Sequence, residues 1–335
     1  MLREEWGAKN SRSDPAYLGT ISVPRQPVMM PSVAILLCTM QGQHFLHEQL
    51  DSILHQSHSA WSIWASDDGS DDDTHAILEE YRTRLGDSRF SIHSGPSEGF
   101  AANFLSLVCN ANITADCYAF SDQDDIWNPD KLTRAVAWLG TVPSDMPALY
   151  CSRTCYVDAN NQAIGVSPLF ARPPGFANAL VQSIAGGNTM VLNDAARNLL
   201  RLAGADANVA SHDWWAYMVI SGCGGRVFYE PEPTVRYRQH ANNLEGANNH
   251  WTGRLLRLYQ LLHGRFRLWN DKNTAALQRM RMHLTPENQR RLDEFGKART
   301  GSLFARLSAF KRSGVYRQTT LDTLSLIVAV VLKKL

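Results

Sequence analysis

The sequence lacks several features that mark common classes of protein. Its six cysteines form no CxxC pair and no zinc-ligand spacing, so we expect reduced thiols and a cytoplasmic location. Lys and Arg number 33 against 32 Asp and Glu, and this balance disfavours a protein that binds DNA or RNA. The apolar run at 319–332 is shorter than the ~20 residues that span a membrane.

Two further absences concern the beginning of the chain. The first thirty residues contain no apolar segment of the signal-peptide type, and prolines interrupt them. We expect residues 1–31 to form a loose N-terminal extension. No Gly-rich and Lys-rich phosphate loop follows, and SGCGGR at 221–226 lacks the GxGxxG spacing of a dinucleotide site. The missing loop disfavours a nucleotidyltransferase, which is kept as an alternative.

Charge is divided unevenly along the chain. Residues 1–250 hold 16 basic and 27 acidic side chains, a net charge of −11, whereas residues 251–335 hold 17 and 5, a net charge of +12. The basic region, 251–335, is predicted to be helical and to have an anionic surface as its partner. Its apolar run, closed by Lys333 and Lys334, is expected to lie in a membrane interface. Packing of these helices on the rest of the chain or in a dimer is the alternative.

Apolar strands alternate with amphipathic helices in the first half of the chain. The run VAILLC at 33–38 is bounded by polar residues, which is typical of a strand buried on both faces. Further strands are predicted at 61–65, 90–93 and 117–120, separated by helices at 43–56, 73–85 and 99–110. Asn128 and Pro129 indicate the start of another helix.

This order predicts an α/β fold, with a mostly parallel, Rossmann-like sheet flanked by helices and ligands bound at the carboxyl ends of its strands. Further along, strands are predicted at 148–157 and 226–229, helices at 193–203 and 212–221, and a turn and strand in IAGGNTMVLN. Residues 32–250 are therefore expected to form one α/β domain, followed by the helical region 251–335.

Two acidic clusters directly follow apolar strands. Asp67 and Asp68 come after WSIWA, and Asp122, Asp124 and Asp125 come after CYAF. In a parallel sheet both clusters face the same crevice. The first cluster also fits a plain turn at the start of a helix. The second lies between two apolar segments, where uncompensated charges are costly.

The second cluster fits a metal ion and a diphosphate. Asp122 and Asp124 are separated by one residue. Two carboxylates at this spacing can coordinate Mg²⁺ or Mn²⁺ and leave positions open for diphosphate oxygens. A metal ion so placed neutralises a diphosphate leaving group, which is the chemistry that phosphoryl and glycosyl donors need. A structural turn is the alternative.

Two later segments carry further candidates. In VRYRQH, Arg236 and Arg238 can reach a diphosphate by charge-assisted hydrogen bonds, and His240 can act as a donor or a metal ligand. A solvated edge strand is the alternative for these three. In HDWW, Trp214 and Trp215 either stack on a sugar ring or lie in the core.

Taken together, the motifs resemble a known family. The segments VAILLCTMQGQHFLHEQLDSILHQSH, SDDGSDDDT, GFAANF, FSDQDDIWNPDKL, HDWW and YRQHANN follow one another as in the family 2 glycosyltransferases of the GT-A fold. The resemblance runs from about Val33 to about Asn243. It is greatest to the rhamnosyltransferase-like branch, which builds O-antigen and other bacterial surface polysaccharides.

The resemblance implies a nucleotide site and a base. Thr39, at the end of the first strand, would lie beside the nucleotide base, and Asp68, with Asp67 beside it, would bind the base or the ribose. Asp213 of HDWW would be the general base that accepts the proton of an acceptor hydroxyl. Inversion at the anomeric carbon follows from this assignment.

The resemblance also implies a metal site and an acceptor segment. Asp122 and Asp124, with Asp125 adjacent, would hold Mg²⁺ or Mn²⁺, and His240 is expected to join them. The segment with Gly187 and Asn188 is similar to the one before the family's acceptor pocket, although a plain turn fits equally well.

The function predicted from these observations is that of a metal-dependent, inverting glycosyltransferase. It would transfer rhamnose from dTDP-rhamnose, or another sugar from its nucleotide donor, to a glycan or an undecaprenyl-linked glycan. The enzyme is expected in the cytoplasm, peripheral to the inner face of the cytoplasmic membrane. A non-catalytic carbohydrate-binding or scaffold protein of the same fold is the alternative from another class.

Overall fold

The computed structural model describes residues 30–239 and 265–335. Almost all of the expected N-terminal extension, and His240, lie outside the described residues. The predicted boundary near residue 250 lies outside them as well.

A parallel half-sheet forms from the first four strands, β1 (Val33–Thr39), β2 (Trp61–Asp67), β3 (Phe90–Ser94) and β4 (Cys117–Ser121). Their spatial order is β3-β2-β1-β4, and every neighbouring pair is parallel. Each strand begins and ends within three residues of its predicted bounds. The alternation of strand and helix in the sequence therefore predicts this half of the fold correctly.

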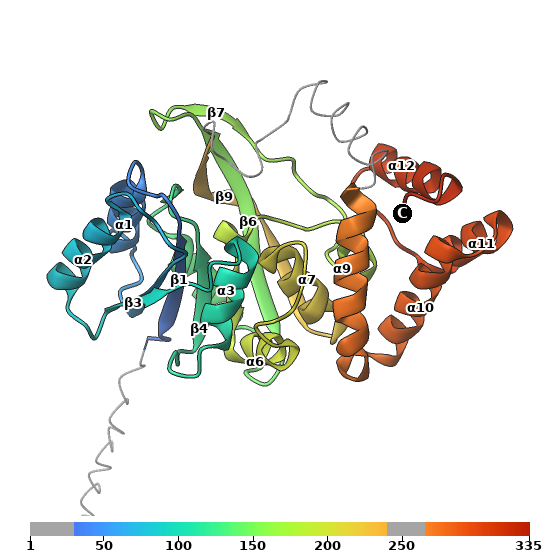
Figure 1. Cartoon of the computed structure of the whole chain (residues 1–335), viewed down its shortest axis with the longest axis horizontal. Coiled ribbons are helices and arrows are strands. Elements are labelled where there is room, and N and C mark those ends of the chain that lie inside the picture. Colours follow the sequence, from blue (N-terminus) through green and yellow to red (C-terminus); the bar gives the residue numbers. More distant parts are fainter. Residues whose placement is uncertain (1–29, 240–264) are drawn as a thin grey trace, which may run out of the picture. The chain divides into compact units, whose positions relative to one another are not determined.

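The second half of the sheet contains β6 (Ala148–Val157), β8 (Val191–Asn193) and β9 (Arg226–Arg238). The short β8 is antiparallel to both β4 and β6, and β6 is parallel to β9. All long strands consequently run in one direction (Figure 1). Two short strands, β5 (Ile126–Trp127) and β7 (Ala163–Val166), pair antiparallel with β9 and β6. The prediction of a mostly parallel α/β sheet is confirmed.

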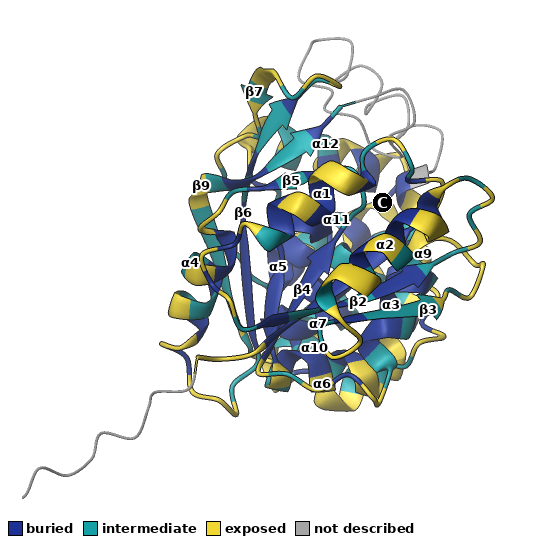
Figure 2. Cartoon of the chain, turned by 90° about the vertical axis from the view of Figure 1, so that its left-hand side faces the viewer, coloured by how far each residue is buried: buried dark blue, intermediate teal, exposed yellow. Residues whose placement is uncertain are grey.

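Helices cover both faces of the sheet. One face packs against α1 (Leu46–Leu54), α2 (Thr74–Leu85) and α4 (Lys131–Leu139), and the other against α3 (Phe100–Cys109), α6 (Asp194–Ala203) and α7 (His212–Gly222). Successive residues of β1 alternate between the two cores. This double burial explains why the strand is apolar throughout, and Figure 2 shows the buried strands between helices with exposed outer faces.

The C-terminal helices extend one of these two cores. They are α9 (Arg265–Arg279), α10 (Pro286–Thr300), α11 (Leu303–Ser313) and α12 (Thr320–Val331), with the short helix η2 (Arg281–His283) after α9. Phe266 and Phe295 belong to the same apolar cluster as Trp215 of α7. The backbone N–H of Thr285 donates to the carbonyl of Gly222 at the end of α7. Residues 265–335, the described part of the region 251–335, are therefore helical and pack onto the sheet domain.

Two details differ from the sequence prediction. The helix expected at Pro129 begins at Lys131, and the Asn128 side chain donates to the carbonyl of Pro233 and does not cap the helix. The strand expected at 226–229 continues to Arg238, because its second half pairs with β6 and β5. Over the described ranges, none of the helices is both long and apolar enough to cross a bilayer.

Candidate active site

Strand register brings the predicted site residues to one edge of the sheet. Thr39 at the end of β1 is opposite Asp67 at the end of β2, and Leu37 is opposite Ser121, the last residue of β4. Asp122 follows Ser121 directly. The two acidic clusters therefore leave the sheet on either side of β1, at the carboxyl edge where α/β proteins bind ligands.

The first cluster is held by short hydrogen bonds. One carboxylate oxygen of Asp67 accepts from the hydroxyls of Thr39 (2.7 Å) and Ser70 (2.6 Å), and the other from the N–H of Ser70 (2.9 Å). The Asp68 carboxylate accepts from the N–H groups of Ser97 (2.7 Å) and Gly99 (3.1 Å). Asp68 thus shapes the loop before α3, whereas Asp67 fixes the end of β1.

The second cluster is tied to β1 by Gln123. The Gln123 side chain accepts from the N–H of Met40 and donates to its carbonyl, both at 2.8 Å. Gly42 makes room for this pairing, because a Cβ at residue 42 would lie 2.4 Å from Gln123 Oε1. The middle residue of the acidic motif is therefore anchored to the loop that follows β1, and Asp122 and Asp124 flank it half-buried.

Like charges crowd Asp122. Burial, and then the negative charges of Asp124 and Asp213, raise the pKa of Asp122 to about 7. Asp213 comes from a distant part of the chain, at the start of α7. The negative charge at the start of α7 therefore acts on the same carboxylate as the charge of Asp124, and a cation would offset both.

Asp125 lies deeper than its neighbours. Its carboxylate is fully buried and accepts from the Asn188 side-chain amide at 2.6 Å and from the Arg238 N–H at 3.4 Å. Burial, followed by the charges of Asp124 and Asp122, raises the pKa of Asp125 well above its ordinary value, and the two hydrogen bonds act in the opposite direction.

Asp213 lies in the first turn of α7, where the helix dipole favours a negative charge. One of its carboxylate oxygens accepts from the Ser211 hydroxyl (2.5 Å) and from the Trp214 N–H (2.6 Å). The other accepts from the Gly187 N–H at 3.1 Å. A carboxylate has about four acceptor positions, so these three donors fix its orientation and leave room for a further donor.

One short turn donates hydrogen bonds to both Asp125 and Asp213. The 3₁₀ turn η1 (Gly187–Thr189) contributes the Gly187 N–H to Asp213 and the Asn188 side chain to Asp125. A Cβ at residue 187 would lie 2.4 Å from His212 Nε2, so glycine is required there for space. The turn thus sets the distance between the acidic motif and the start of α7.

The carboxylates of the acidic motif fit a metal ion whose remaining ligands come from the substrate. In the described ranges, no group of three His, Cys, Asp or Glu side chains is arranged to hold a metal by itself. Mg²⁺ is usually bound by one or two carboxylates together with substrate phosphates, and not by a cage made only of protein. Asp122 and Asp124, half-buried and repelling each other, match that donor set.

Four of the predicted site residues are engaged by partners within the protein. Trp215 is fully buried in the core, and Trp214 is buried with its indole N–H donated to the Ala179 carbonyl. Both indoles therefore lie in the core, which is the second of the two roles expected for them. Arg236 donates to the carbonyl of Asn161 at 2.5 Å.

Arg238, the fourth, is fully buried and connects three segments. Its guanidinium donates to the carbonyls of Asp124 (3.1 Å) and Ala159 (2.7 Å) and pairs with Glu48 of α1 at 2.8 Å. We therefore attribute to it the positioning of the acidic motif, and not a direct contact with a diphosphate.

Two site residues were not identified from the sequence. Lys131 is fully buried against the ring of Trp127, and its pKa is well below the ordinary value because of burial, an effect that Asp125 and Asp122 oppose. His212 stacks on Phe104 beside the start of α7. A single Lys at a helix start and a His before an Asp carry no sequence signal of burial, so only the fold reveals them.

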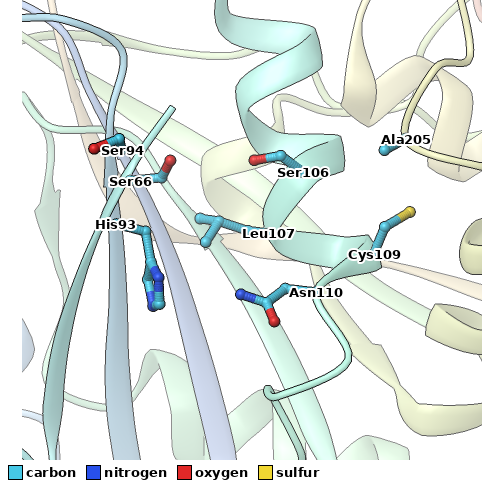
Figure 3. Close-up of a pocket in the computed structure, with 8 residues that line it drawn as sticks. All are labelled: Ser66, His93, Ser94, Ser106, Leu107, Cys109, Asn110 and Ala205. Carbon is cyan, nitrogen blue, oxygen red and sulfur yellow. The ribbon is translucent and has the colours of Figure 1, made fainter. Parts of the chain in front are cut away.

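A hollow of about 360 Å³ lies elsewhere on the described surface. Figure 3 shows its lining, with Ser66 and His93 from the strands and Ser106, Cys109 and Asn110 from α3 and the residue after it. None of the carboxylates described above lines it. The candidate active site is therefore the carboxyl edge of the sheet, and not this hollow.

Comparison with known proteins agrees with this geometry. The structure is similar to that of S. aureus TarS 1-349 in complex with UDP-GlcNAc, with a TM-score of 0.50 and 14% identity over 84% of this chain and 89% of that chain. At this identity the likeness concerns the fold, and it confirms the GT-A fold expected from the sequence. The fold is thus an α/β fold of the GT-A type.

The sequence comparisons are more specific. Residues 34–179 match the model of Glycosyl transferase family 2. The dTDP-rhamnosyl transferase RfbG of Shigella flexneri is 29% identical over 231 residues, 66% of this chain and 78% of that protein. An uncharacterized glycosyltransferase of Haemophilus influenzae is 24% identical over 233 residues, 66% of this chain and 69% of that protein. These similarities support a family 2 glycosyltransferase, with the domain of that family at residues 34–179.

Proposed function

We propose that the protein transfers a sugar from a nucleoside diphosphate donor to a hydroxyl acceptor with inversion at the anomeric carbon. One observation carries the proposal: the turn η1 donates to Asp213 through the Gly187 N–H and to Asp125 of the acidic motif through the Asn188 side chain. A base and a diphosphate site are the two functions that such a transfer requires.

Asp213 is the proposed general base. Its carboxylate accepts the proton of the acceptor hydroxyl as that oxygen attacks the anomeric carbon and the bond to the donor diphosphate breaks. Ser211, Trp214 and Gly187 donate hydrogen bonds that hold the carboxylate in one orientation. A base fixed in this way loses little freedom when the acceptor binds.

Asp122 and Asp124 are the proposed ligands for Mg²⁺ or Mn²⁺, with Asp125 behind them. A bound divalent ion supplies charge neutralisation for the departing nucleoside diphosphate. Asp125 is occupied by Asn188 and Arg238, which supports a role in holding the motif and not in direct ligation. Thr39 is proposed to lie beside the nucleotide base, and Asp68, with Asp67 beside it, to bind the base or the ribose. Thr39 and Asp67 are adjacent at the ends of β1 and β2.

The donor that we propose is dTDP-rhamnose. The support is the likeness to a relative named dTDP-rhamnosyl transferase, of which this chain covers 78%. For the acceptor we propose a glycan, carried on an undecaprenyl-type lipid at the inner face of the cytoplasmic membrane and extended during surface polysaccharide synthesis. Release of the nucleoside diphosphate, and not of pyrophosphate, is the expected product signature.

Ligand-dependent stabilisation tests the site before the acceptor is known. We expect one of dTDP, UDP and GDP to raise the melting temperature strongly with Mn²⁺ and weakly with EDTA, because a ligand that binds only the native state stabilises it. Asp122→Asn should remove the Mn²⁺-dependent part. Asp87→Asn, an exposed acid far from the motif in sequence, is the control and should behave as wild type. Stabilisation that is equal with and without Mn²⁺ would contradict the proposed metal site.

A further inference from the structure

The C-terminal helices expose an apolar face. On α12, the exposed side chains Leu321, Leu324, Val328 and Val331 recur at spacings of three and four residues, so they form one stripe. The opposite side of α12 is buried in the main core. The helix is therefore apolar on both sides, and the described residues cover only one of them.

The first turn of α11 carries two more exposed apolar side chains. Arg306 is buried in α11 and donates to the carbonyl of Val331 at 3.0 Å, so the start of α11 lies beside the end of α12. Leu303 and Phe304 are exposed in that turn, and Phe304 is 85% exposed. Figure 1 shows the two helices near each other close to the C-terminus. We define the α11–α12 face as Leu303, Phe304, Leu321, Leu324, Val328 and Val331.

Positive charge borders the α11–α12 face. Lys333 and Lys334 directly follow the last turn of α12, and no described ion pair includes either of them. The single acid in α12, Asp322, is at the opposite end and accepts a hydrogen bond from the Thr319 hydroxyl. Both ends of the chain segment are held in place, because Arg299 also donates to the carbonyl of Leu335.

We propose that the α11–α12 face docks onto a bilayer surface that contains anionic lipids, with the helices lying in the interface. An apolar face with lysines at its border is the arrangement of interfacial helices, and lysines near such a surface are attracted to its charge. A second copy of the chain is the other possible occupant, and the dimer measurement below tests it.

Docking goes beyond the proposed function, since it does not depend on which sugar is transferred or on whether Asp213 is the base. Failure of the docking proposal can therefore be distinguished from failure of the proposed function. Loss of vesicle binding without loss of nucleotide binding concerns this face alone, and Asp213→Asn should bind vesicles as the wild type does.

Vesicle flotation of the full chain tests the proposal. We expect binding to vesicles that contain phosphatidylglycerol, weak binding to phosphatidylcholine alone, and a decrease at high salt. Lys333→Glu with Lys334→Glu should lower partitioning by at least about 25-fold, since each lysine contributes about fivefold. Phe304→Ser with Leu324→Ser should lower it on the order of tenfold through lost apolar burial.

Leu202→Ser is the matched control, because Leu202 is 62% exposed on α6, outside the α11–α12 face. Melting temperatures of all variants establish that they fold, and the lysine variants keep the test valid if the apolar pair destabilises the protein. Equal partitioning of the face variants and the control would overturn the proposal. So would absence of binding together with a concentration-dependent dimer that Leu324→Ser abolishes.

Discussion

The sheet domain and the C-terminal helices differ in the side chains that lack a compensating partner, which are acidic at the site and apolar on the α11–α12 face. In the sheet domain, Asp125 and Lys131 are fully buried, and like charges crowd Asp122. In the helices, charges pair with each other at the surface, as Arg281 does with Asp293, while large apolar side chains such as Phe304 are exposed. Uncompensated charge calls for a polar ligand, and uncompensated apolar surface calls for an apolar partner.

The comparison explains why one chain carries both regions. The nucleotide sugar that we propose as donor is charged, so its site would need buried acceptors and a cation. The lipid-linked acceptor that we propose would remain at a membrane, so the enzyme would need a surface that brings the site to it. The predictions below test each side of this division, beginning with the sheet domain.

The largest effect is expected for Asp213→Asn. The amide keeps the shape of the side chain but cannot accept a proton, so turnover should fall by about 10²–10⁴. Binding of the nucleoside diphosphate with Mn²⁺ should be retained, because only the attacking group is lost. Release of nucleoside diphosphate measures turnover, and calorimetry measures binding. Wild-type turnover in this variant would show that the base is elsewhere.

A smaller effect is expected at the turn η1. Substitutions of its two neighbouring residues should affect nucleotide binding and turnover differently. Asn188→Ala leaves the buried Asp125 carboxylate without its 2.6 Å donor, a loss of about 1–3 kcal/mol. It should weaken Mn²⁺-dependent nucleotide binding about tenfold to a hundredfold. Gly187→Ala pushes against His212 and should lower turnover while nucleotide binding persists.

Gly296→Ala is the control for the glycine substitution, because a Cβ there meets nothing within 4 Å. The two turn variants are compared at equal fractions of folded protein. If both variants lose binding and turnover in the same ratio, the turn contributes only to general stability and does not separately support the base and the acidic motif.

Most of the sheet could be predicted from the sequence, because burial on both faces leaves a direct signal. The run 33–38 is apolar throughout since its residues alternate between two cores, and the acids that follow 61–65 and 117–120 mark the carboxyl edge. The apolar runs and the positions of the acids after them were therefore sufficient to predict that Asp67 and Asp122 lie at one edge of the sheet.

The partners of the site residues could not be predicted in the same way. That Asn188 bonds to Asp125, or that Arg238 is occupied by Glu48, depends on contacts between segments far apart in the chain. Neither the composition nor the spacing of VRYRQH separates an arginine that binds a diphosphate from one that positions a loop. Such roles follow only from the tertiary contacts.

A third effect should appear in stability and not in turnover at neutral pH. Burial lowers the pKa of His212 from 6.5 to about 4. Between these values the unfolded chain binds a proton that the native protein does not, so the free energy of unfolding falls as the pH falls through this window. The His212 contribution to this loss between pH 7.5 and 5 is about 2 kcal/mol.

His212→Leu removes the titrating group and should make the decrease correspondingly smaller. Urea unfolding of both proteins at the two pH values measures the difference, and effects of the carboxylates that both proteins share cancel in the comparison. An identical decrease in the two proteins would mean that His212 is protonated in the native state.

The smallest effect is expected for the ion pairs of the C-terminal helices. Arg281 and Asp293 form a two-pronged pair at 2.6 and 2.8 Å, but both side chains are more than a third exposed. Exposed pairs contribute little, because water solvates the charges when they separate. Arg281→Met should therefore leave the urea midpoint and the turnover unchanged, in contrast to Asn188→Ala. A large decrease of the urea midpoint in Arg281→Met would contradict the contrast between the two regions. Charge in the C-terminal helices would then be as important for stability as charge in the sheet domain.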